Sequence, residues 1–66
     1  MYNYEPLRGH IASNGLTVKA LMREVGFSTN VAVALNNDKP VTIEVLADIC
    51  RHLRIPIEEV VRIELD

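Results

Sequence analysis

The sequence has few of the residues that support covalent or metal chemistry. It contains one cysteine, Cys50, which excludes an intrachain disulfide and favours a reducing compartment. No metal-ligand spacing joins Cys50 to His52, and His10 belongs to a different predicted helix. We therefore expect no enzyme activity, no metal and no cofactor, and we interpret Cys50 as a small buried hydrophobe.

Long apolar runs, linkers and low-complexity segments are also missing. No stretch approaches the about 18 apolar residues that a membrane span needs, and the first six residues are too polar for a signal peptide. We expect a cytoplasmic protein with no membrane partner. A chain of 66 residues predicts a single domain, residues 1–66. Such a chain buries only about 60% of its unfolded surface, so a homodimer is expected on size alone.

The charge is not that of a strongly basic nucleic-acid binder. Nine acidic against seven basic residues give a net charge of -2. The excess is uneven, since residues 1–41 carry four basic and three acidic side chains and residues 42–66 carry three basic and six acidic ones. Net charge sets long-range steering and non-specific affinity, so we expect weak, salt-sensitive binding to random DNA rather than none.

Two short helices, at about residues 17–25 and 28–36, form the centre of the predicted fold. Thr17 is a good N-cap for the first, and Gly26 ends it because glycine readily takes the left-handed conformation. Ser28 then caps the second helix. The second helix has an apolar face formed by Val31, Ala32 and Leu35. This pattern predicts a helix-turn-helix, although a plain helical hairpin has the same glycine spacing.

Three further helices are expected around this pair. A first helix, capped by Asn3 and closed at Asn14-Gly15, places on one face Tyr4, Leu7, Ile11 and Ala12. Thr42 caps a fourth helix, whose buried face holds Leu46, Ile49, Cys50 and Leu53. Pro56 is expected to begin a fifth helix, with Val60 and Val61 packing inward. Between the third and fourth helices, residues 36–40 form a polar turn that either reaches phosphates or is simply solvated.

The spacing of apolar residues changes at the end of the sequence. Val61, Ile63 and Leu65 alternate with charged residues, and this two-residue period favours a short strand. Such a strand could pair with its copy in a second subunit, whereas a frayed helix end is the alternative. The fold class expected is therefore all-α, a compact five-helix domain with a short C-terminal strand.

The order of these segments resembles a known family, the lambda-repressor-like, Cro/XRE-type DNA-binding domains, and in particular a compact branch with little beyond five helices. The residues that carry the resemblance are Leu16-Thr17, Leu21, Gly26-Phe27-Ser28 and Leu35, together with residues 41–53 and 57–61. The resemblance implies a transcriptional regulator that binds an operator in double-stranded DNA, usually as a dimer. It also implies a third helix in the major groove.

Site residues follow from the resemblance by position. Base contacts are implied for Ser28, Thr29, Asn30 and Val33. Phosphate contacts are implied for the start of the second helix and for the segment after the third, namely Thr17, Lys19, Asn36, Asn37 and Lys39.

Three positions depart from the family pattern. Thr29 and Ala34 stand where the branch commonly has a basic residue, and Met22 stands where the broader family prefers alanine. Since the third helix is uncharged, two functions are open. One is an operator-binding regulator, expected to be a repressor. The other is a protein-binding module of the same fold that acts on another transcription factor.

Overall fold

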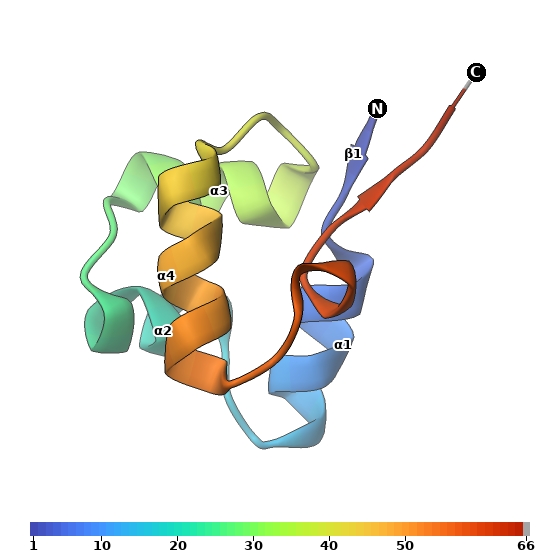
Figure 1. Ribbon diagram of the computed structural model, residues 1–66. Helices are drawn as coiled ribbons and strands as arrows, with labels where there is room; N and C mark the ends of the chain where they lie inside the picture. Colours follow the sequence, from blue (N-terminus) through green and yellow to red (C-terminus); the bar gives the residue numbers. More distant parts are fainter. Residues whose placement is uncertain (66) are drawn as a thin grey trace.

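Four α-helices make up most of the computed structural model, which describes residues 1–65 (Figure 1). They are α1 (Glu5–Ser13), α2 (Val18–Val25), α3 (Thr29–Asn37) and α4 (Ile43–Leu53). A 3-10 turn, η1 (Ile57–Glu59), and two short strands, β1 (Tyr2–Asn3) and β2 (Arg62–Ile63), complete the fold. Within this described range, no helix is both long enough and apolar enough to cross a membrane.

The prediction of a fifth helix is wrong. Pro56 has an extended backbone (φ -74°, ψ 163°), and only the three residues of η1 separate it from Val60. Val60 is fully buried and β2 begins two residues later, so the chain has no room for an α-helical turn between the proline and the core. The inward packing expected of Val60 is confirmed.

The molecule is mostly helical, which corrects the expected all-α class. The short C-terminal strand predicted from the two-residue period is present as β2. Its partner within the chain is β1, a strand that the residue pattern did not predict; the two pair antiparallel, with Tyr2 opposite Ile63 and Asn3 opposite Arg62. The strands near the two ends of the chain, β1 and β2, therefore lie side by side, as Figure 1 shows.

Side-chain caps begin three of the helices where the sequence places them. Thr17 Oγ1 accepts a hydrogen bond from the Ala20 N–H at 3.0 Å. Ser28 and Thr42 do the same for α3 and α4. At α1 the N-cap residue is Tyr4, which makes no side-chain cap bond; Asn3, the expected cap, lies one residue further out, and its Oδ1 accepts from the Glu5 N–H at 2.8 Å. Each cap satisfies an amide that has no partner inside its helix.

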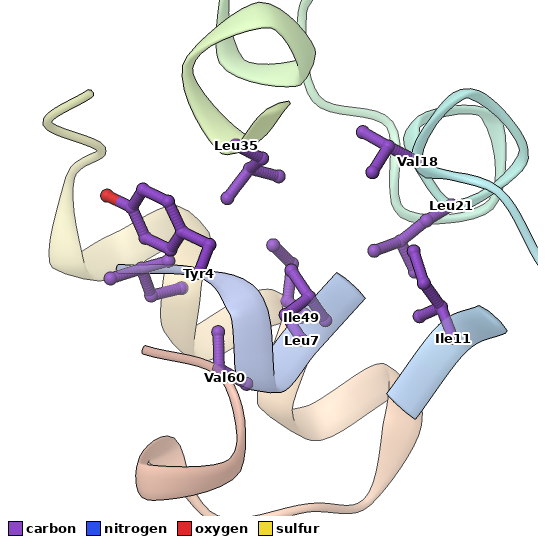
Figure 2. Packing of buried hydrophobic residues seen from close by; sticks show 9 residues of the cluster. Tyr4, Leu7, Ile11, Val18, Leu21, Leu35, Ile49 and Val60 are labelled. Carbon is purple, nitrogen blue, oxygen red and sulfur yellow. The ribbon is translucent and has the colours of Figure 1, made fainter. Parts of the chain in front are cut away.

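A single core lies between the helices, and Figure 2 shows its side chains converging from every helix and from the segment after η1. The buried residues are Tyr4, Leu7, Ile11, Val18, Leu21, Leu35, Leu46, Ile49 and Val60. Ala12, which was expected on the buried face of the first helix, is exposed. Since Leu35 is the one fully buried residue of α3, this side chain anchors the helix to the core.

Candidate nucleic-acid interface

The turn between α2 and α3 fixes how α3 leaves the core. Gly26 takes the left-handed conformation (φ 93°, ψ 21°), and its N–H donates to the Met22 carbonyl at 2.8 Å. Phe27 then packs against the core before Ser28 caps the next helix. A residue with a Cβ is disfavoured at this φ, so glycine suits the turn.

The outward side of α3 carries the residues predicted to contact bases. Ser28, Thr29 and Asn30 are all exposed in and before the first helical turn, and Val33 is 54% exposed one turn later. Thr29 and Val33 are four residues apart, so they lie on the same side of the helix. Within residues 1–65 no hydrogen bond engages the Asn30 amide. We call Ser28, Thr29, Asn30 and Val33 the α3 outer face.

The predicted phosphate contacts fall in two places. Thr17 and Lys19 are exposed at the start of α2, where the first amides of a helix have no intrahelical partner. Asn36 and Asn37 were expected in a loop, but α3 continues through Asn37, so both belong to its last turn. The Asn37 amide nitrogen donates to the Val33 carbonyl at 2.8 Å, which holds this side chain along the helix. Lys39 is exposed just beyond the helix.

All nine predicted contact residues are therefore exposed, as binding to a partner requires. The structure brings the α3 outer face and the last turn of α3 together on one helix. Thr17 and Lys19 lie at the start of α2, and within residues 1–65 no hydrogen bond connects their side chains to α3.

Sequence reasoning missed the residues that hold the segment after α3. Asp38 ends α3 in the left-handed conformation (φ 56°). Its Oδ1 accepts hydrogen bonds from Arg8 Nη1 and from the Tyr4 N–H, both at 2.9 Å. Arg8 Nη1 also donates to the Leu35 carbonyl at 2.6 Å, and the Tyr4 hydroxyl donates to the Lys39 carbonyl at 2.8 Å. We call Tyr4, Arg8 and Asp38 the α1–α3 clamp.

The clamp has an electrostatic consequence. The hydrogen bond from Arg8, followed by that from the Tyr4 N–H, holds the pKa of Asp38 below its ordinary value of 3.8. Asp38 is thus ionised at neutral pH, and the Arg8 guanidinium offsets its charge. The Asp38 carboxylate lies next to Lys39 in the chain and would repel phosphates there, but the positive charge of Arg8 compensates it. The signal that could have been noticed is the Asp after two asparagines, since Asn and Asp tolerate left-handed backbone at helix ends.

Elsewhere the surface is less suited to DNA. An open groove of about 540 Å³ lies between α1 and η1, and its lining includes Glu5, Glu58 and Glu59. Arg62 also lines the groove, but the three carboxylates outnumber it and disfavour phosphate, so this groove is not part of the candidate interface. Cys50 is half-buried against the core, and burial raises the pKa of its thiol, which disfavours the reactive thiolate. No group of three potential metal ligands occurs in residues 1–65.

Comparison with known proteins agrees with this geometry. A family model described as the Cro/C1-type HTH DNA-binding domain matches residues 7–66, which is nearly the whole chain. No curated protein and no solved structure matches the sequence. The chain belongs to the Cro/C1-type helix-turn-helix family, and the resemblance found in the sequence is confirmed. The family consists of DNA-binding transcription regulators and not of enzymes.

Proposed function

For this member of the Cro/C1-type family, we propose the function of a sequence-specific repressor that inserts α3, from Ser28 onward, into the major groove of an operator. The observation that carries the proposal is the α3 outer face. It is exposed along the helix while Leu35, on the other side, is fully buried. An exposed helix held rigidly on a small core has the shape that the major groove admits.

Each residue of the outer face has a suited base partner. The Asn30 amide both donates and accepts, so it matches the N6 and N7 edge of adenine. Thr29 and Ser28 hydroxyls can bond to several bases, and the exposed Val33 methyls suit the methyl group of thymine. With no charged residue from Ser28 to Leu35, guanine, which is most often recognised by Arg or Lys, has no dedicated partner on this helix. We expect an operator rich in A·T pairs.

The backbone contacts come from both ends of the motif. Thr17 and Lys19 would meet one phosphate group at the α2 N-terminus, and Asn36, Asn37 and Lys39 would meet another beyond α3. The α1–α3 clamp supports the second site, because Tyr4, at the start of α1, donates hydrogen bonds to the carboxylate of Asp38 and to the carbonyl of Lys39. Only two lysines take part per protomer, so the salt dependence should be shallow, with log K falling by about 0.9 per neutralised phosphate for each tenfold rise in salt.

A homodimer in the cytoplasm completes this proposal. A chain that buries as small a core as this one gains stability and operator length by acting in pairs. Two copies related by a two-fold axis would place two α3 helices about 34 Å apart, on half-sites one helical turn apart.

One observation favours a second function. Val33 is 54% exposed on a helix without charge. Such a face is desolvated at low cost, so it could also dock in an apolar groove of another transcription factor. Two substitutions distinguish the two functions. Lys39→Ala should weaken binding to every DNA sequence alike, whereas a protein complex through the outer face should tolerate it and be lost in Val33→Asp.

Selection from a random duplex library tests the proposal and yields the operator sequence in the same experiment. The wild type should enrich a sequence with two half-sites. Asn30→Ala should enrich the same sequence with one base position relaxed in each half-site, because a bidentate contact discriminates by roughly 1 to 3 kcal/mol. Arg51→Ala, an exposed cation on α4, is the matched control and should leave the selected sequence unchanged. Enrichment of no sequence by the wild type would refute the repressor proposal.

A further inference from the structure

Within residues 1–65 the strand β2 pairs with β1 along one edge, and no other strand pairs with its second edge. The Glu64 N–H donates to the Met1 carbonyl at 2.8 Å, and the Met1 amine donates back to the Glu64 carbonyl at 2.9 Å. In an antiparallel pair, hydrogen-bonded and non-bonded positions alternate. Tyr2 and Ile63 are therefore a non-bonded pair, and the N–H and C=O of Ile63 point away from β1. Such an edge is a template for another strand.

One face of the β1–β2 ribbon is apolar and extends beyond the core. The Tyr2 ring stacks on the ring of fully buried Tyr4, with centroids 6.4 Å apart. Ile63, opposite Tyr2, shares this face and is 58% exposed, and Leu65 follows on the same side at 91%. Figure 1 shows both chain ends running away from the helices together. Contiguous apolar side chains that are exposed to solvent are typical of surfaces that contact another protein.

From this edge and this face we infer that a second copy of the chain pairs with β2, antiparallel, about a two-fold axis at Ile63. The inference rests on the homodimer in the proposed function and assigns its interface. Two ribbons then form a four-stranded sheet in which the two Ile63 residues exchange backbone hydrogen bonds across the axis. The apolar residues of both ribbons share one face of that sheet.

The charges beside Ile63 specify this register. With the axis at Ile63, Arg62 lies opposite the partner's Glu64, and Glu64 lies opposite the partner's Arg62. Moving the axis by one residue places either Arg62 or Glu64 opposite its own copy, and like charges directly opposite each other destabilise a sheet. The sequence Arg-Ile-Glu is thus self-complementary in one antiparallel register.

The interface is small, and this affects how it works. Strands of two residues bring few side chains, so the buried area falls short of the about 800 Å² per partner of a standard interface. We expect weak pairing in solution that strengthens when two half-sites hold both copies on one duplex, since the second contact is then intramolecular.

A charge-reversal experiment tests the register without DNA. Arg62→Glu places carboxylates opposite each other at both positions, and Glu64→Arg does the same with cations. Each variant alone should self-associate about tenfold more weakly or worse in sedimentation equilibrium, because both cross-strand pairs become repulsive. An equimolar mixture should restore association, because the mixed dimer regains two opposite-charge pairs. Arg51→Glu on α4 is the control and should associate like the wild type.

A cross-link gives a second, independent readout. In a Cys50→Ser background, Ile63→Cys should form an intermolecular disulfide readily, since Cα atoms of a hydrogen-bonded antiparallel pair are about 5.5 Å apart, within disulfide range. Glu64→Cys is the matched control, because its two copies are offset along the strands and should cross-link much more slowly.

The results separate this interface from DNA binding. Wild-type protein that stays monomeric at the highest attainable concentration, variants that associate as the wild type does, or a mixture without rescue would each overturn the interface. A rescued mixture with no DNA preference in the selection would support the interface and refute the repressor proposal.

Discussion

Substituting glycine by alanine at two positions distinguishes the effect of backbone conformation on stability from the effect of packing. Gly26 has φ 93° and Gly9 lies inside α1, and a Cβ added at either position meets no atom within 4 Å. Any difference between Gly26→Ala and Gly9→Ala therefore arises from the backbone and not from a clash. Both changes reduce the freedom of the unfolded chain similarly.

The expected effects have opposite signs. At Gly26 the Cβ meets the local steric cost of a left-handed residue, about 1 to 2 kcal/mol, and the gain from a stiffer unfolded chain offsets only part of it. Gly26→Ala should thus lower the free energy of unfolding by about 1 kcal/mol. Gly9→Ala should raise it by about 0.5 to 1 kcal/mol, the helix-propensity difference between the two residues.

Thermal unfolding followed by circular dichroism measures both changes. For a domain of this size, 1 kcal/mol corresponds to a shift of about 4–8 °C in Tm. Gly26→Ala should melt earlier than the wild type and Gly9→Ala later. A Gly26→Ala protein as stable as the wild type would show that the turn does not require left-handed backbone, and the reasoning about the α2–α3 geometry would be refuted.

Four further substitutions test the caps and the α1–α3 clamp. Thr17→Ala and Thr42→Ala should each lower the free energy of unfolding by about 1 kcal/mol, because each removes an N-cap. Only Thr17→Ala should also weaken DNA binding, and equal DNA affinity of the two variants would contradict the phosphate contact of Thr17. Tyr4→Phe should lower the free energy of unfolding in urea by about 1 kcal/mol, because the Lys39 carbonyl loses its hydroxyl partner. An unchanged urea midpoint would show that this hydrogen bond does not stabilise the clamp. Because the pKa of Asp38 is lowered from 3.8, its ionised form stabilises the fold above that pH, and this stabilisation should be lost as the pH falls through the lowered value. In Asp38→Asn the free energy of unfolding should therefore depend less on pH in this acid range. A pH dependence like that of the wild type would contradict the clamp.

Local signals in the sequence were enough to place the helix-turn-helix. Thr17, Ser28 and Thr42 cap helices through an amide three residues later, and Gly26 turns the chain with its own φ, so each effect depends only on near neighbours. The apolar period likewise placed Leu21 and Leu35 in the core. These features do not depend on how the rest of the chain folds.

Contacts between distant residues could not be predicted in this way. The pairing of Tyr2 with Ile63 joins the two ends of the described chain, and nothing in the sequence near Tyr2 marks a strand. The hydrogen bond from Arg8 to Asp38 spans 30 positions. With Asp38 as the left-handed cap, α3 ends later than the polar run suggests, so Asn36 and Asn37 are helical. The candidate site was thus located by local pattern, whereas the clamp that supports it was not.

The central claim is that α3 recognises DNA sequence, and fluorescence anisotropy tests it most directly. Wild type and Asn30→Ala would each be titrated against the selected duplex and a scrambled duplex, at low and near-physiological salt. We expect the wild type to prefer the selected duplex at both salt concentrations, and Asn30→Ala to show a smaller preference for it while binding the scrambled duplex unchanged. Equal wild-type binding to both duplexes, abolished at near-physiological salt, would contradict the claim.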